Sequence, residues 1–290
     1  MNISIGARQN IDGLRSTLNS QFALLTGVEV QLAEQEVGGF TFIDCNPIRP
    51  AASDNLAERV FKHYLANALA EIILGNWENG LINRELKLHH QYFSDQERAI
   101  ISDKVLKVLN NCAGMSLTYR HSRKTRIAQK IRDYLEIHDK LILEGFIRFR
   151  LKEYYSELQA AITVAVDEFV MEKEYLEFIR LLRYFVDIQE PKIETLHVLV
   201  KPSGGFQLYD QDNNMVNNDY LDGFVADLVD NEITYEDLLI SALITIAPRF
   251  VVLHVTAKRE SETIRTIRNV FGDRVSNCQG CSLCSLSSKS

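Results

Sequence analysis

Apolar and polar residues alternate in short segments near the N-terminus. Residues 3–5 read as a short strand. In the segment 28–34, Val28, Val30 and Leu32 share one face, and in the segment 40–45 two phenylalanines alternate with Thr41 and Ile43, which predicts two further strands. Between the first two strands, apolar residues recur every three or four positions from Ile11 to Leu25, which predicts one face of a helix. A β-α-β-β unit is therefore expected over residues 1–50.

The middle of the chain, residues 51–190, has a helical pattern. Ser94 and Glu97 have the spacing of a capping box, which predicts a helix start there. A further helix is expected to begin at Ser122. From residue 140 to 189 there is no proline and Gly145 is the only glycine, so one long helix or a stacked pair is expected.

Strand patterns return after Pro191. The segments 196–200 and 249–255 read as buried strands, and a last short strand precedes Cys278. Helices are expected over 238–246, with Thr234 and Asp237 framing the cap, and over 260–271, ended by Gly272. The predicted fold is α+β. The N- and C-terminal α/β segments would form one mixed sheet, with a large central all-helical segment packed beside it.

This pattern divides the chain into four segments. They are the N-terminal unit 1–50, the helical segment 51–190, a C-terminal α/β unit over 191–277 and a Cys-rich tail over 278–290. The composition is 46% hydrophobic and 24% charged with a net charge of -7, which is ordinary for a soluble globular protein. No apolar run approaches the roughly 20 residues of a membrane span, and no signal peptide is recognised, so a cytoplasmic location is expected.

The tail carries the clearest chemical motif. Cys278, Cys281 and Cys284 form C-x2-C-x2-C, a spacing that lets thiolates surround one small centre, and Gly280 allows the turn between two of them. In a reducing compartment such cysteines are more often ligands or redox groups than disulfides. The motif suits either a zinc ion or an iron–sulfur cluster. The alternatives are redox chemistry of the thiols and a loose tail without a specific role.

The motif lacks a fourth ligand. A bacterial ferredoxin motif would continue with Cys and Pro, where this chain has Ser288 and Lys289. Cys45 ends a predicted strand as Cys278 does, so it would lie beside the tail if the two strands were neighbours. His254 is the second choice, and an exogenous ligand or another subunit is the third.

A basic stretch offers a second type of site. Six cations fall within about three and a half helical turns. They are Arg120, Arg123, Lys124, Arg126, Lys130 and Arg132. A nucleic-acid contact is one interpretation, and a solvated helix surface is the other. The acidic total charge disfavours nonspecific nucleic-acid affinity.

The segment 149–200 and the terminal cysteines resemble a known protein family. "RFRLKEYYSELQAAITVAVDEFVMEKEYLEFIRLLRYFV", "ETLHVLV" and "CQGCSLC" resemble the YtxC-like family, which is associated with sporulation in endospore-forming Firmicutes. The resemblance implies a sporulation-associated protein and brings no catalytic residues. No catalytic motif is found either. A non-enzymatic scaffold or regulator with a protein partner is therefore the first hypothesis, a nucleic-acid-binding module the second, and an enzyme the least favoured.

Overall fold

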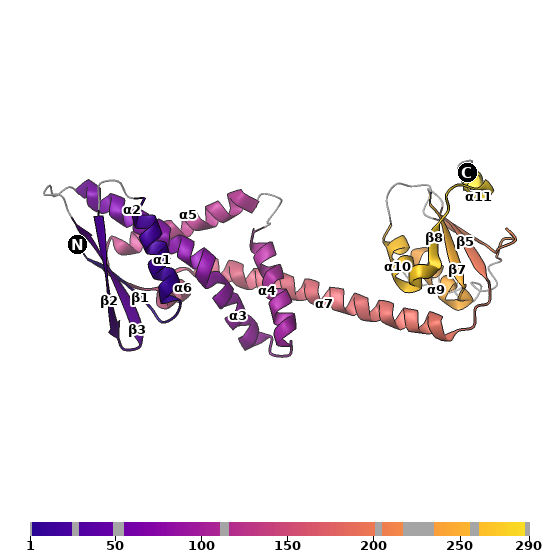
Figure 1. The fold of residues 1–290 in the computed structure, drawn as a ribbon, viewed down its shortest axis with the longest axis horizontal. Helices are drawn as coiled ribbons and strands as arrows, with labels where there is room; N and C mark the ends of the chain where they lie inside the picture. Colours follow the sequence, from indigo (N-terminus) through magenta and orange to yellow (C-terminus); the bar gives the residue numbers. More distant parts are fainter. Residues whose placement is uncertain are drawn as a thin grey trace. The chain divides into compact units, whose positions relative to one another are not determined.

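The computed structural model describes residues 2–24, 29–48, 55–110, 116–200, 205–216, 235–255 and 261–287. The chain divides into two compact units, residues 1–170 and 171–290. The boundary falls within the long helix α7 (Lys152–Ile188), which contributes residues to both units. Each unit has its own sheet, its own helices and its own apolar core (Figure 1).

The first unit is built on a four-stranded sheet in the order β2-β3-β1-β4. Its strands are β1 (Ile3–Ala7), β2 (Glu29–Val37), β3 (Phe40–Ile48) and β4 (Lys140–Ile142). β3 pairs antiparallel with both β1 and β2, whereas β4 pairs parallel with β1. Gly38 and Gly39, both with positive φ, form the tight turn between β2 and β3, as a two-residue hairpin turn requires.

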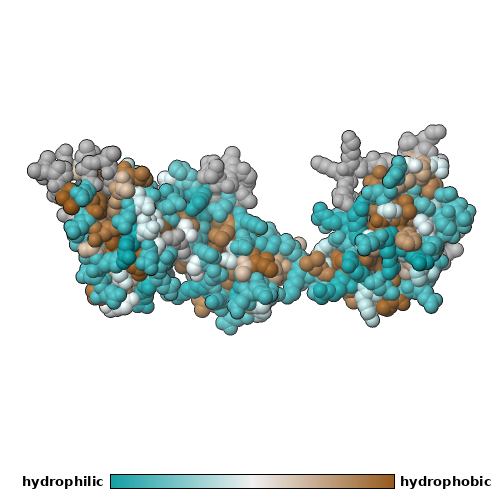
Figure 2. Space-filling view, in the orientation of Figure 1, coloured by the Kyte–Doolittle hydropathy of each residue, from teal (hydrophilic) through white to brown (hydrophobic). Residues whose placement is uncertain are grey.

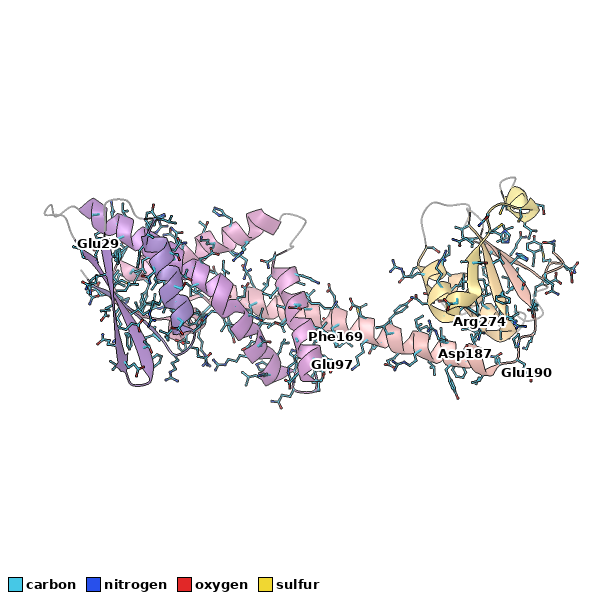
Figure 3. All side chains as sticks on the ribbon, in the orientation of Figure 1. Glu29, Glu97, Phe169, Asp187, Glu190 and Arg274 are labelled. Atoms are coloured by element: carbon cyan, nitrogen blue, oxygen red, sulfur yellow. The ribbon has the colours of Figure 1, made fainter. Side chains whose placement is uncertain are left out.

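The helices of this unit share one continuous apolar core with the sheet. They are α1 (Ile11–Phe22), α2 (Asn55–Ile72), a π-helical segment (Ile73–Trp77), α3 (Glu78–His89), α4 (Asp95–Asn110), α5 (Ser116–Leu135), α6 (Leu143–Arg150) and the first part of α7. The capping box before α4 is confirmed, because Ser94 and Glu97 exchange hydrogen bonds of 2.8 and 3.2 Å (Glu97 is labelled in Figure 3).

The first unit also departs from the predicted pattern in three places. Helix α5 begins at Ser116 and not at Ser122. The central segment is not wholly helical, since residues 140–142 form β4, a strand too short to show an alternating pattern. Residues 143–150 form the separate helix α6, and the long helix starts at Lys152 and runs for 37 residues. The single-helix form of the prediction is therefore observed only from Lys152 to Ile188.

The second unit contains a four-stranded sheet in the order β6-β5-β7-β8. Its strands are β5 (Thr195–Val200), β6 (Phe206–Tyr209), β7 (Phe250–Val255) and β8 (Val275–Asn277). β5, β7 and β8 are parallel, and β6 is antiparallel to β5. The helices are α9 (Tyr235–Ile246), α10 (Glu262–Phe271), the short α11 (Ser282–Ser287) and the end of α7.

One face of the second sheet carries the core of this unit. Leu196 and Val198 of β5 and Val251 and Leu253 of β7 point toward the apolar sides of α9 and α10. The end of α7 packs on the same core through Ile179 and Val186, among others. An ion pair of 2.8 Å between Asp187 and Arg274, both labelled in Figure 3, joins the end of α7 to the 3-10 turn that precedes β8.

The α+β class is confirmed, and helices dominate the chain between the two sheets. The prediction of one shared sheet is wrong, because the N- and C-terminal strands build two separate sheets of four strands each. The surface in view in Figure 2 is mostly hydrophilic on each unit, with apolar side chains scattered among polar ones. In the part of the chain that the structure describes, no helix combines the length and the hydrophobicity needed to cross a membrane.

Candidate metal centre

The edge of the second sheet brings two of the predicted ligand positions together. β7 and β8 run parallel, so their carboxyl ends lie at the same edge. The backbone N–H of Cys278 donates to the carbonyl of Leu253 over 2.9 Å, which extends the ladder by one residue beyond β8. Cys278 therefore lies beside His254, the residue that follows Leu253.

The segment after Cys278 turns back over the sheet and delivers the other two cysteines. Gly280 has φ of 118°, a conformation that glycine adopts at no steric cost, and its N–H donates to the Cys278 sulfur over 3.3 Å. Cys281 immediately precedes α11 and Cys284 lies within it. The buried side chain of Leu283 anchors α11, which packs against β5 and β7.

Four ligand atoms converge at this point. The Sγ atoms of Cys278, Cys281 and Cys284 and a ring nitrogen of His254 all lie within 4.8 Å of one another. Nδ1 of His254 is 3.3 Å from the sulfur of Cys284 and 3.5 Å from that of Cys281. The sulfur of Cys284 is 3.7 Å from that of Cys278 and 3.9 Å from that of Cys281.

These separations match a single tetrahedral ion. With metal–sulfur bonds of about 2.3 Å and metal–nitrogen bonds of about 2.0 Å, a tetrahedron places two sulfurs about 3.8 Å apart and a sulfur and nitrogen about 3.5 Å apart. An iron–sulfur cluster distributes its cysteines over several irons around an inorganic core, which requires a wider spacing than one ion does. The Cys3His donor set with four protein ligands is that of structural zinc sites.

The protonation of two of the ligands, His254 and Cys281, also suits a metal. Burial lowers the pKa of His254 below its ordinary value and the neighbouring His197 lowers it further, so the imidazole is held in the neutral form that binds metals. Burial acts to raise the pKa of the Cys281 thiol, but hydrogen bonds from the Cys284 backbone and the Cys278 side chain lower it overall. A lowered thiol pKa favours the thiolate, which is the form that coordinates.

His197 is a part of this site that the sequence pattern did not single out. Its Nδ1 lies 3.0 Å from Nε2 of His254, the ring nitrogen that faces away from the cysteines. When Nδ1 of His254 binds a metal, Nε2 carries the proton and donates it to His197, which fixes the orientation of the ligand ring. The signal in the sequence that could have identified His197 is that each of two predicted buried strands contains a single histidine. The structure pairs these two strands in parallel.

The first choice for the fourth ligand, Cys45, lies elsewhere. It sits in β3 of the first unit opposite Ile3 of β1, fully buried in that unit's core. Burial, with a smaller effect of Asp44, raises the pKa of its thiol to about 12, so the thiolate is strongly disfavoured. The fourth ligand atom in the group is that of His254, the second choice. The remaining cysteine, Cys112, lies outside the described residues.

The six cations of the basic stretch lie on α5, and carboxylates neutralise most of them. Arg120 and Lys124 both pair with Glu71, and Arg126 pairs with Glu157. Arg123 is buried against Glu78, and Arg132 bonds to Gln129 and His63. Lys130 is exposed. Nucleic-acid binding by this helix stays a prediction. Fewer of its positive side chains are free of a carboxylate partner than the six cations in the sequence suggest.

Comparison with known proteins places the chain in a family. The sequence profile of the YtxC-like family matches residues 63–276, which is more than half of the chain. The chain belongs to the YtxC-like family. The match includes His197 and His254 and ends two residues before Cys278, so the case for the metal centre rests on the geometry of this chain.

A relative from Bacillus subtilis (strain 168), named "Uncharacterized protein YtxC", is 34% identical over 160 residues. The matched part is 53% of this chain and 54% of the relative, so the chain spans about half the length of that protein. No solved structure matches the chain.

Proposed function

We propose that the second unit holds one zinc ion between His254, Cys278, Cys281 and Cys284. The observation that carries the proposal is the convergence of four ligand atoms within 4.8 Å. Four of their six separations lie between 3.3 and 3.9 Å, which suits a tetrahedral ion. Three ligands come from a tail of seven residues and the fourth from β7. The ion would therefore tie α11 to the sheet and replace the packing that so short a helix cannot provide by itself.

We further propose that the protein is a cytoplasmic, non-enzymatic scaffold or regulator associated with sporulation, acting through a protein partner. A site with four protein ligands leaves no position for water or substrate, which is typical of structural and not catalytic zinc. Reduced thiols are maintained in the cytoplasm, where a three-cysteine site retains its ligands. Membership of the YtxC-like family supports the association with sporulation.

Elemental analysis tests the metal. The full chain, purified anaerobically, is expected to contain about one zinc per chain and no visible sulfur-to-iron absorbance. His254→Ala and Cys281→Ser are each expected to lose most of the zinc, because three ligands bind far more weakly than four. Cys45→Ala is the matched control and is expected to keep the wild-type zinc content, since its thiol lies in the first unit.

The possible results separate the alternatives. Iron together with visible absorbance would show that the site holds an iron–sulfur cluster and not zinc. A preparation that contains neither metal would overturn the proposed metal centre. Zinc that is lost in Cys45→Ala but kept in His254→Ala would show that the fourth ligand is Cys45.

Spore formation tests the biological role separately. Deletion of the gene in its host is expected to reduce the count of heat-resistant spores, and the wild-type gene, but not the Cys281→Ser form, is expected to restore it. Unchanged spore counts after deletion would contradict the sporulation role and would leave the metal centre untouched.

A further inference from the structure

A cavity of about 190 Å³ lies in the first unit, between α5 and the junction of α6 and α7. Half of its ten lining residues are cations. They are Arg123, Arg126 and Lys130 of α5, Arg150 at the end of α6 and Lys152 at the start of α7. Its carboxylates are Glu153 and Glu157. The wall of the cavity therefore carries more positive than negative charge.

The lining of the cavity includes a buried guanidinium with unused hydrogen-bond donors. The side chain of Arg123 is 1% exposed, and one of its terminal nitrogens, Nη2, donates to Glu78. Glu78 also accepts from the hydroxyl of Tyr154 over 3.0 Å. Nε and Nη1 of Arg123 have no partner among the described residues. Buried donors without a partner cost free energy, so an acceptor within the cavity would stabilise this side chain.

The first turn of α7 adds backbone donors to the same cavity. The carbonyl of Leu151 accepts the first bond of the helix, from the N–H of Tyr155 over 2.9 Å. The N–H groups of residues 152–154 precede that bond and have no acceptor within the helix. These three residues line the cavity, and α7 is 37 residues long, so the positive end of a long helix dipole faces it.

The existing ion pairs leave part of the positive charge free. Glu157 is engaged by Arg126 through bonds of 2.7 and 3.1 Å. Lys130, Arg150 and Lys152 form no ion pair with any residue that the structure describes, and all three are exposed at the rim. Glu153 is the one rim carboxylate that could oppose them. The cavity thus has an excess of about two positive charges, which suits a doubly charged anion.

We propose that this cavity binds a phosphate group, either inorganic phosphate or the phosphate of a small phosphomonoester. The phosphate oxygens would accept from the buried Arg123, from the first turn of α7 and from Lys130 and Lys152 at the rim. The volume is below the roughly 300–1,000 Å³ of pockets for drug-sized ligands, which favours a small ligand over a nucleotide. A nucleic-acid backbone would reach the rim cations but not the buried Arg123.

Titration calorimetry on the full chain tests the proposal. Sodium phosphate and glycerol phosphate are each titrated at constant ionic strength, with sodium chloride as the reference anion. Saturable binding at one site per chain is expected for at least one of the two phosphates and not for chloride. Lys130→Ala and Lys152→Ala, both exposed and safe for folding, are each expected to weaken that binding roughly tenfold.

Arg148→Ala is the matched control, because Arg148 is an exposed cation of α6 that does not line the cavity. It is expected to bind phosphate as the wild type does. If Arg148→Ala weakens phosphate binding as much as the two lysine variants do, the effect comes from the overall charge of the protein and not from this cavity. If neither phosphate shows saturable binding at tens of millimolar, the proposal is overturned. If single-stranded RNA or DNA binds more tightly than both phosphates, and if Lys130→Ala and Lys152→Ala abolish that binding, the site would be assigned to nucleic acid instead.

Discussion

Replacement of His197 by alanine is expected to weaken zinc binding although it removes no ligand. Nδ1 of His197 lies 3.0 Å from Nε2 of His254, whose other ring nitrogen faces the cysteines. In the proposed site this bond would orient the His254 ring and make it a stronger ligand. Without it, the orientation of the His254 ring would be less firmly fixed, and a buried N–H would lose its acceptor.

The size of the effect follows from the contacts. The two rings are 5.1 Å apart with an angle of 55° between their planes, so stacking contributes little and the hydrogen bond is the main interaction lost. Loss of such an outer partner typically reduces metal affinity 10- to 100-fold. One neutral hydrogen bond contributes about 0.5–1.5 kcal/mol, which is about 2- to 13-fold in affinity, so the two ranges overlap near tenfold.

Competition with a chromophoric zinc chelator measures this loss. His197→Gln is expected to recover most of the affinity, because its amide oxygen can accept the bond from His254. His121→Ala, an exposed histidine of α5, is the matched control and is expected to bind zinc as the wild type does. An affinity of His197→Ala within twofold of the wild type would refute the reasoning, and a Gln variant as weak as Ala would assign the effect to packing.

Three further predictions concern the first unit. Ser94→Ala removes the helix cap of α4 and is expected to lower the free energy of unfolding by about 1 kcal/mol in chemical denaturation. Glu78→Gln leaves the buried charge of Arg123 without its partner and is expected to cost roughly 3–5 kcal/mol in the same assay; a loss below 1 kcal/mol would contradict the burial of this pair. Burial and the hydrogen bond to Glu85 raise the pKa of Tyr155 to about 12, so the folded state favours the protonated phenol. The stabilisation is present below the ordinary pKa of about 10 and is lost as the pH rises from about 10 to about 12, and thermal unfolding of Tyr155→Phe should lack this part of the pH dependence.

Features that depend on neighbouring residues could be predicted from the sequence. The alternation in residues 40–45 predicts β3, and the Ser94–Glu97 spacing predicts the start of α4, because both follow from contacts within a few residues. β4 has only three residues and exists because it pairs with β1, which is more than 130 residues away along the chain. Its sequence lies in a helix-like run, so local pattern could not reveal it.

The fourth ligand of the candidate metal site shows the same limit of prediction from local sequence. Cys45 and Cys278 each come at the end of a predicted strand with a similar local pattern, and only the pairing of strands distinguishes them. Cys45 pairs with Ile3 in the first sheet, whereas Cys278 bonds to Leu253 at the end of β7, which sets it beside His254. A motif of closely spaced cysteines therefore predicts that a site exists, because its spacing is local. Completion of that site depends on which strand becomes the neighbour of β8, and that choice is made by the core of the second unit, where the apolar faces of β5 and β7 meet α9 and α10.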